Sequence, residues 1–212
     1  MGQYYRALVI DAAYDYKVLE PWAFPSETKL MEHAWIGNQF VNAVYSLIHN
    51  NPCEVAWIGD DSDKPYDPDA DAYAKAMPRR NFCETYDIVW GNQLWESQRV
   101  DLTQPGEFSE AQFSLVDHET SDMYLINHSR KCYLELGAYI QCSTVKDGSP
   151  EGRCLNPLPL LTACGNGRGE GDFREGNVGY EDVGIWAFDE LEYSDKLPKG
   201  YTKKHFRFIE HQ

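Results

Sequence analysis

A run of alternating glycines is the feature of this sequence that most constrains its fold. The run reads Gly-Asn-Gly-Arg-Gly-Glu-Gly-Asp-Phe over residues 165–173. Glycine loses more backbone entropy on folding than any other residue, so four glycines in seven positions need a structural reason. Either the backbone adopts positive φ angles there, or a ligand or a neighbouring strand comes close to it. We expect the rest of the chain to be organised around this loop.

Length and composition predict a chain that folds around its own apolar core. The 212 residues suffice for one large domain or two small ones, and 42% of them are hydrophobic. No apolar run approaches the roughly 18 residues of a membrane span. The N-terminal residues lack the apolar segment of a secretory signal. We therefore expect a cytoplasmic protein that does not engage a membrane.

The charge of the chain restricts its partners. The formal net charge is −15, and the acidic residues are spread over both halves. A field of this sign repels nucleic acid and anionic lipid, so we expect no direct nucleic-acid binding. The same field suits a basic protein partner. The alternative is that the charge serves solubility alone.

Six cysteines occur in the chain, and their spacing matches no metal site. They are Cys53, Cys83, Cys132, Cys142, Cys154 and Cys164. No CxxC pair is present, which argues against a zinc knuckle. Without a secretion signal, we expect reduced thiols that act as small buried hydrophobic side chains. We expect no cofactor.

Hydrophobic patterning predicts strands separated by short helices. The expected strands are residues 4–11, 14–19, 54–59, 86–90, 123–127, 131–140, 183–188 and 205–209. We expect one helix to open at Ser26 and to be interrupted at Gly37. Further helices are expected at residues 38–49 and 69–77. Residues 96–122 have the weakest pattern and are expected to form a linker or an exposed excursion.

The two halves of the chain carry similar motifs. In each half, a Gly-Asn pair precedes a Trp-x-x-Asp motif by about 20 residues: Trp57 to Asp60 in the first half and Trp186 to Asp189 in the second. We therefore expect an α+β protein that arose by internal duplication. Residues 1–95 and 123–212 would be two similar halves of one compact domain, built around a mainly antiparallel sheet. The alternative is chance similarity.

Several stretches resemble a scattered family of uncharacterised bacterial and phage proteins. They are GQYY at residues 2–5, KLMEHAWIGNQF at residues 29–40, LNPLPLLTACGNGRGEGDF at residues 155–173 and VGIWAFD at residues 183–189. The resemblance covers most of the chain. In similar sequences the loop reads GNGRGGGD, so Glu170 departs from the pattern. The resemblance implies a shared domain and no established activity.

The glycine loop is the main candidate site. Asn166, Gly167 and Gly169 would offer backbone N–H groups to an anion, and the Arg168 guanidinium would bind phosphate or carboxylate. The loop matches neither the dinucleotide-binding pattern nor the P-loop pattern. In the structural alternative, Asp172 pairs with Arg168 and closes the loop without any ligand.

Polar residues elsewhere provide weaker candidates. Asn127 ends an expected strand and His128 follows it, and we expect both to face the same crevice as Arg168. Glu32 and His33 are neighbours on an expected helix, where they would serve acid–base chemistry. Each of these pairs also has an ordinary structural interpretation.

An acidic cluster follows the strand at residues 54–59. Asp60, Asp61 and Asp63 are carboxylates of the kind that hold divalent ions. The following aspartates do not complete an EF-hand, because its glycine and its final glutamate are missing. A solvated acidic loop is the alternative to a metal site.

Three functions remain open from the sequence. The first is a binding protein, without enzymatic activity, that holds or sequesters an anionic, nucleotide-like small molecule and is encoded by a phage. The second is an acidic inhibitor, or nucleic-acid mimic, that docks on a basic host protein. The third is a metal-dependent hydrolase that uses the cluster Asp60, Asp61 and Asp63.

Overall fold

One eight-stranded sheet organises the described part of the chain. The computed structural model describes residues 3–24, 26–60, 122–143, 155–164, 173 and 176–209. The strands are β1 Tyr5–Ile10, β2 Tyr16–Leu19, β3 Cys53–Gly59, β4 Tyr124–Asn127, β5 Cys132–Glu135, β6 Ala163–Cys164, β7 Glu190–Ser194 and β8 Thr202–Lys203. The helices are η1 Pro21–Ala23, α1 Leu30–His33, α2 Gln39–Leu47, α5 Leu136–Ser143, α6 Pro157–Thr162 and η2 Tyr180–Asp182. The described part is therefore α+β, as expected.

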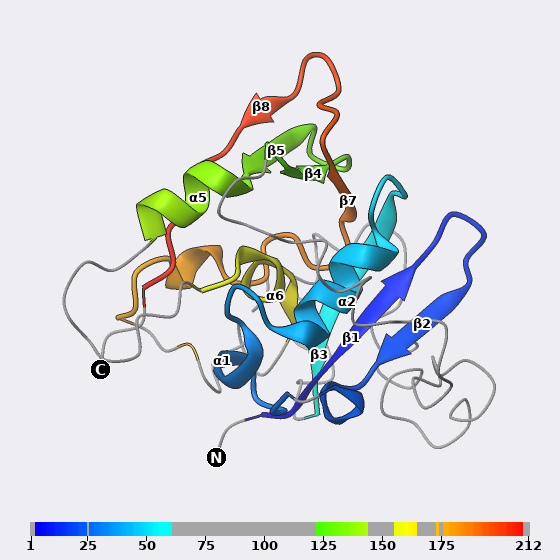
Figure 1. The fold of residues 1–212 in the computed structure, drawn as a ribbon, viewed down its shortest axis with the longest axis vertical. Helices are drawn as coiled ribbons and strands as arrows, with labels where there is room; N and C mark the ends of the chain where they lie inside the picture. Colours follow the sequence, from blue (N-terminus) through cyan, green and yellow to red (C-terminus); the bar gives the residue numbers. More distant parts are fainter. Residues whose placement is uncertain are drawn as a thin grey trace, which may run out of the picture.

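The sheet is mainly antiparallel, and both halves of the chain contribute to it. The strand order is β2-β1-β3-β7-β4-β5-β8, and β6 pairs with β3. Only the β3–β6 and β5–β8 pairs are parallel among the described strands. β1, β2 and β3 form one end of the sheet, whereas β4, β5 and β8 gather at the other (Figure 1). The β3–β7 pair joins the two ends.

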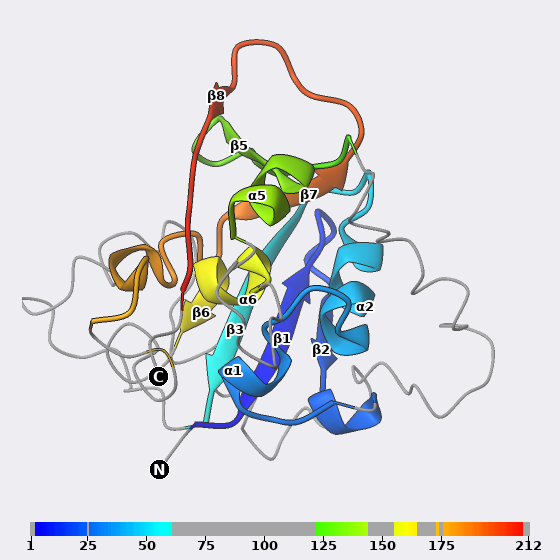
Figure 2. The same ribbon diagram turned by 60° about the vertical axis from the view of Figure 1, so that its left-hand side comes forward.

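The main core lies between the sheet and the helices α1, α2 and α6, which lie on one face of β1 and β3 (Figure 2). Asn38 begins α2, because its side chain accepts a hydrogen bond from Val41 N. The buried Phe40 of α2 packs edge-on against Trp57 of β3, with ring centroids 5.6 Å apart. The main core thus forms where the apolar face of α2 packs on one face of the sheet.

β1 is buried on both faces. Tyr5, Ala7 and Val9 point into the main core. Leu8 and Ile10 point the other way, into a smaller cluster with Ile58 and Phe188. Burial on both sides explains why β1 is an almost continuous run of apolar residues rather than an alternating one.

Several sequence predictions are confirmed with small shifts of boundary. β1, β2, β3 and β4 fall where strands were expected, and α2 falls within the expected helix at 38–49. The expected helix at Ser26 is reduced to the single turn of α1, whose N-cap is Lys29. The expected helix at 69–77, the strand at 86–90 and nearly all of the linker at 96–122 lie outside the described residues.

One predicted strand is confirmed only in its first half, and two are wrong. Residues 131–140 split into the strand β5 and the helix α5, which begins directly after it at Leu136. Residues 183–188 form turns, since Gly184 and Phe188 have φ angles of 72° and 62°. Their apolar side chains indicate burial, and burial does not require a strand. Residues 205–209 follow the edge strand β8 instead of forming one.

None of the helices in the described ranges combines the length and the apolar character that crossing a membrane requires.

Candidate functional site

The structure describes only some of the residues expected to form a site. Asn127, His128 and Asp60 are described. The residues that fall outside the described ranges are Asn166, Gly167, Arg168, Gly169, Asp172, Asp61 and Asp63. The predictions for the glycine loop and for the acidic cluster therefore stay predictions, apart from Asp60.

Asn127 is fully buried at the end of β4, and its side chain is held at both ends. Its Nδ2 donates to Asp189 Oδ2 at 2.8 Å, and its Oδ1 accepts from Arg130 N at 2.9 Å. The first bond ties the β4–β5 turn to the start of β7, and the second closes the turn itself. Asn127 is thus a buried positioning residue that does not face solvent.

Arg130 shares the same carboxylate. Its Nε donates to Asp189 Oδ2, while 43% of its side chain remains exposed. Asp189 in turn is buried, with a side-chain exposure of 4%. One edge of the guanidinium is therefore fixed, while much of the side chain stays exposed. A fixed, exposed guanidinium is a group that binds phosphate or carboxylate.

Arg130 and Lys204 also affect the pKa of Cys132 on β5. Burial raises the pKa of the Cys132 thiol, and the charges of Lys204 and Arg130 oppose that rise. Lys204 N donates to Tyr133 O, which places the start of the 204–209 segment beside β5. Arg130, Lys131 and Lys204 are all exposed. The β4–β5 turn and the end of β8 together present cations to solvent.

His128 lies between two side chains from distant segments. Its Nε2 is 2.7 Å from Glu192 Oε2, and its Nδ1 is 3.0 Å from the Tyr201 hydroxyl. A carboxylate only accepts hydrogen bonds, so Nε2 carries the proton. In the neutral ring, Nδ1 then accepts from Tyr201. Both nitrogens are therefore engaged, and His128 links Glu192 to Tyr201.

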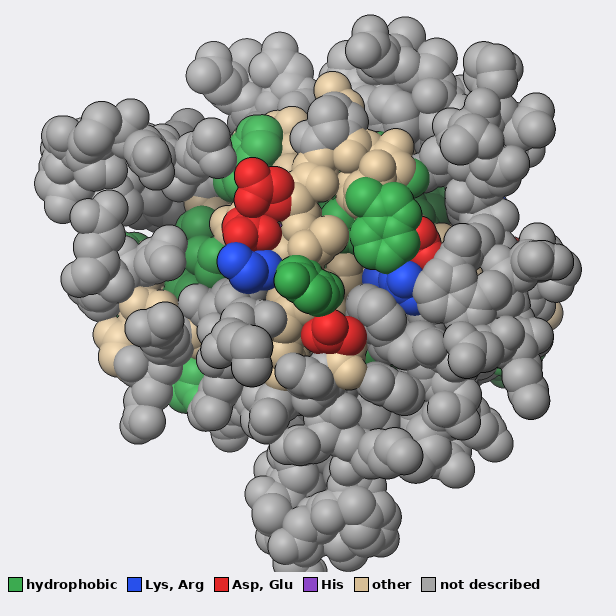
Figure 3. Space-filling model, turned by 90° about the horizontal axis from the view of Figure 1, so that it is seen from below, with side chains coloured by type: hydrophobic (Ala, Val, Ile, Leu, Met, Phe, Trp, Pro, Cys, Tyr) green, Lys and Arg blue, Asp and Glu red, His purple; other side chains and the backbone are tan. Residues whose placement is uncertain are grey.

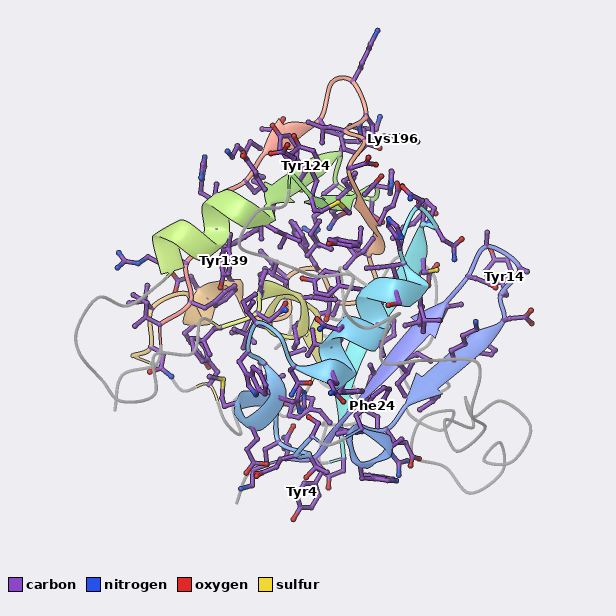
Figure 4. The ribbon with its side chains drawn as sticks, viewed as in Figure 1. Tyr4, Tyr14, Phe24, Tyr124, Tyr139 and Lys196 are labelled. Atoms are coloured by element: carbon purple, nitrogen blue, oxygen red, sulfur yellow. The ribbon has the colours of Figure 1, made fainter. Side chains whose placement is uncertain are left out.

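Three tyrosines share the outer face of the sheet at this end. Pairing places Tyr124 opposite Glu135, Tyr133 opposite Ile126, and Lys203 beside Tyr133. Side chains of paired residues point to the same face, as do residues two apart in a strand. Tyr201 therefore joins Tyr124 and Tyr133 on this side. We call these three residues the tyrosine face. Figure 4 shows Tyr124 at this end of the molecule.

The tyrosine face is partly exposed and internally braced. Tyr124 and Tyr133 pack edge to face with ring centroids 5.5 Å apart, and Tyr201 packs on His128 at 5.7 Å. Lys203 Nζ donates to Glu135 Oε2, which raises the pKa of Lys203. The opposite face of these strands carries Leu125 and Leu134, which belong to the main core. The main core therefore lies on the face opposite the tyrosine face.

Asp60 has a structural role at the other end of the sheet. Its Oδ1 accepts from Tyr4 N at 2.9 Å, and its own N–H donates to Tyr4 O. Seen from this end, the coloured surface mixes acidic, basic and hydrophobic side chains (Figure 3). Among the described residues, no three His, Cys, Asp or Glu side chains come close enough to hold a metal ion.

The Glu32–His33 pair is structural as well. His33 is fully buried, its Nδ1 lies 3.1 Å from Glu27 O, and its Nε2 accepts from Trp57 Nε1 at 3.1 Å. Burial lowers the pKa of His33 to about 4. Glu32 is bonded to the backbone and side chain of Lys29. The helix therefore offers no acid–base pair to a substrate.

The described cysteines behave as small buried side chains. Cys53, Cys132 and Cys164 are buried free thiols. Burial raises the pKa of Cys53 to about 11, although it lines a shallow hollow with Asp11 and Lys17. A thiol with so high a pKa is protonated at neutral pH and is a poor nucleophile.

Sequence reasoning missed most of the partners in the site. Asp189 was noticed only as part of a repeated motif, and Arg130, Glu192 and Tyr201 were not noticed. Each bonds to a residue 59 to 73 positions away. Nothing local in the sequence marks such pairs. The one available signal was the polar stretch Asn-His-Ser-Arg directly after a strand.

Searches of protein-family models, of curated proteins and of solved structures found no match to this chain.

Proposed function

We propose that this protein is a non-enzymatic binding protein for an anionic, nucleotide-like small molecule, with Arg130 as the residue that contacts the anion. The observation that carries the proposal is the position of the Arg130 guanidinium. The buried Asp189 holds its Nε edge, and 43% of the side chain stays exposed. A cation fixed in this way loses little side-chain entropy when it binds an anion.

The surroundings of Arg130 support a ligand with both charge and an aromatic ring. Lys131 directly precedes β5, Lys204 directly follows β8, and both are exposed. Tyr133 lies on β5 and is partly exposed. A phosphate on the cations and a base against a tyrosine ring would use both kinds of group.

The nearby polar groups have a positioning role in the proposed site. The Asn127 side chain forms a hydrogen bond with Asp189, and the His128 side chain forms hydrogen bonds with Glu192 and Tyr201. They build the site and do not face a substrate. Among the described residues they were the only predicted ligand contacts.

The proposal also includes a cytoplasmic location and an internal duplication. A cytoplasmic location is supported by the free thiols of Cys53, Cys132 and Cys164. Internal duplication is supported by one parallel between the two Trp-x-x-Asp motifs. Asp60 fixes Tyr4, and Asp189 fixes Arg130, each through its carboxylate.

Isothermal titration calorimetry with pyrophosphate and with uridine monophosphate tests the proposal. We expect Arg130→Gln to weaken binding about 10- to 100-fold, since a hydrogen bond to a charged group is lost. Arg207→Gln is the matched control, because Arg207 is also exposed and lies beside Gly179, away from the β4–β5 turn.

Arg168→Gln separates this site from the glycine loop. Unchanged binding in Arg130→Gln together with lost binding in Arg168→Gln would overturn the proposed position. Absence of any binding by the parent protein would overturn the proposed function. Circular dichroism confirms that each variant is folded.

A further inference from the structure

We infer that Tyr201 is a site of covalent acylation, at which His128 and Glu192 activate the tyrosine hydroxyl towards a neutral, activated ester. The inference goes beyond the proposed function and depends on other side chains than Arg130. A protein that accepts a single acyl group needs no turnover, so the inference is compatible with a binding protein.

The geometry of three side chains carries the inference. The Tyr201 hydroxyl oxygen lies 3.0 Å from His128 Nδ1, and His128 Nε2 lies 2.7 Å from Glu192 Oε2. We call these three side chains the Tyr201 relay. A hydroxyl within hydrogen-bond reach of a base, with the base oriented by a third group, is the arrangement that activates a nucleophile.

Glu192 sets the tautomer that this chemistry requires. Because its carboxylate accepts a hydrogen bond from Nε2, the lone pair of the neutral imidazole lies on Nδ1. Nδ1 is the nitrogen that contacts the Tyr201 hydroxyl. The negative charge of Glu192 also stabilises the imidazolium that forms when His128 takes up the phenolic proton.

The backbone positions the relay before any acyl donor arrives. His128 directly follows β4, and its backbone N–H donates to the carbonyl of Glu190 on β7. Glu192 lies two residues further along β7. Thr202 N donates to the backbone of the β4–β5 turn, which fixes the residue next to Tyr201. The relay therefore loses little conformational freedom when it reacts.

The base and the carboxylate are sheltered, whereas the tyrosine reaches solvent. The side chains of His128 and Glu192 are 18% and 15% exposed. Tyr201 is partly exposed. Shelter from water strengthens the hydrogen bonds within the relay, and the partial exposure of Tyr201 allows a donor to approach it.

Charge selects the class of donor. With a neutral imidazole, the relay carries the negative charge of Glu192. A phosphoryl donor is itself an anion and is repelled by this charge, whereas a carboxylic ester is neutral. A relay of hydroxyl, imidazole and carboxylate is also suited to attack on a carbonyl carbon. We therefore assign an acyl group to this site rather than a phosphoryl group.

The acylation step involves one nucleophile and one proton acceptor. The Tyr201 hydroxyl oxygen forms a bond to the carbonyl carbon of an aryl ester, and the phenolic proton moves to His128 Nδ1. The bond between that carbon and the aryl oxygen breaks, and the aryloxide leaves as an anion. His128 then releases the proton to water. The products are an ester on Tyr201 and the aryloxide, and no group is oxidised or reduced.

Treatment with p-nitrophenyl acetate tests the inference, with peptide mass spectrometry to locate each acetyl group. At neutral pH, the parent should release a stoichiometric burst of nitrophenolate and should carry the acetyl group on Tyr201 in preference to Tyr4 and Tyr14. The latter two are internal controls, because they are 49% and 59% exposed and lie at the β1–β2 end of the sheet (Figure 4). Hydroxylamine, which cleaves tyrosyl esters and leaves lysyl amides intact, identifies the ester.

Three variants separate the roles within the relay. Tyr201→Phe keeps the ring and should abolish the burst. His128→Gln should slow acetylation of Tyr201 at least about 100-fold, because the general base is lost. Glu192→Gln should slow it at least about 10-fold, since an amide N–H can donate to Nε2 and move the ring proton onto Nδ1. Acetylation of Tyr4 and Tyr14 in the same samples should not change.

The pH dependence distinguishes an activated hydroxyl from a structural tie. A phenol without a base reacts through its phenolate, whose fraction rises about tenfold for each pH unit below its pKa. The titratable side chains that contact His128 in the described part of the chain are Glu192 and Tyr201. With His128 as the base, the rate at Tyr201 should be level from neutral to mildly alkaline pH. In Glu192→Gln, the rate should rise with pH.

Two outcomes would overturn the inference. The first is acetylation of Tyr201 no faster than that of Tyr4 and Tyr14 in the parent, a comparison that does not depend on whether any variant folds. The second is an unchanged rate and pH profile at Tyr201 in Glu192→Gln, shown by circular dichroism to be folded. Calorimetry with Arg130→Gln tests the proposed function separately, so either can fail alone.

Discussion

Asn127 and Asp189 lie 62 residues apart in the sequence, and a hydrogen bond of 2.8 Å joins their side chains inside the protein. Asn127 is fully buried, and Asp189 is 3% exposed. The same carboxylate holds Arg130. One buried acid thus ties β4, the β4–β5 turn and the start of β7 together, and it orients the guanidinium that we propose as the anion contact.

Replacing Asp189 with alanine is expected to lower the free energy of unfolding by about 1–3 kcal/mol. The change leaves the buried Nδ2 of Asn127 without its acceptor, and that loss costs most of this amount. Urea denaturation measures the change. Asp189→Asn is the control, because its amide oxygen still accepts a hydrogen bond, so its loss should be smaller. Equal losses in the two variants would contradict this role.

Acidification is expected to destabilise the protein through His33. Its pKa in the folded protein is about 4, below the value of about 6.5 in an unfolded chain. The unfolded chain therefore takes up the proton first. Stability should be full above about pH 6.5 and should fall as the pH drops towards 4, by about 3 kcal/mol in total from this group.

Urea denaturation between pH 4 and pH 7 measures the His33 contribution when the parent is compared with His33→Gln. Carboxylates titrate in the same range, but they are common to both proteins. The difference in unfolding free energy should shrink as the pH falls. A difference that stays constant from pH 7 to pH 4 would show that His33 does not contribute.

Cys53 and Cys132 are expected to resist alkylation in the folded protein. Burial raises the pKa of both thiols, to about 11 for Cys53, so little thiolate is present at pH 8. Iodoacetamide treatment followed by peptide mass spectrometry tests this, with urea-unfolded protein as the control. Rapid modification of Cys53 under native conditions would contradict its buried, protonated state.

Tyr45 and Asn156 provide a test of how the two halves of the chain are joined. The Tyr45 hydroxyl donates to Asn156 Oδ1 at 3.0 Å, and the same oxygen accepts from Leu158 N at the start of α6. Tyr45→Phe should cost about 1 kcal/mol. Asn156→Ala should cost more, because it also removes the N-cap of α6.

A double-mutant cycle isolates the Tyr45–Asn156 bond. The two changes should not add, since either one removes the same hydrogen bond. Strict additivity in urea denaturation would mean that the bond contributes nothing to stability.

The sequence predicted elements whose signal is local. A run of aromatic and branched residues located β1, an alternating pattern located β2, and Asn38 before an apolar helical pattern located the start of α2. The segment around Trp186 misled, because its apolar side chains are buried in turns that hydrogen-bond to α6: Gly184 N to Leu160 O and Trp186 N to Leu161 O. A buried turn and a buried strand can have the same apolar composition, so composition alone does not distinguish them.

The site was predictable only in part, for a physical reason. Asn127 and His128 were identified as polar residues after a strand, and the structure brings them beside Asp189 and Glu192. Their role as positioning residues follows from partners 62 and 64 residues away. Sheet order decides such pairs, and the register of β4 against β7 cannot be read from local pattern.

Chemical-shift mapping tests the central claim, the position of the anion site, most directly. Uridine monophosphate is titrated into isotopically labelled protein, and backbone amide shifts are followed by nuclear magnetic resonance. We predict that the perturbed amides lie at residues 124, 128–135 and 201–204, and that Arg130→Gln removes the effect. Shifts confined to the glycine loop at residues 165–173, or an unchanged spectrum, would contradict an anion site at Arg130.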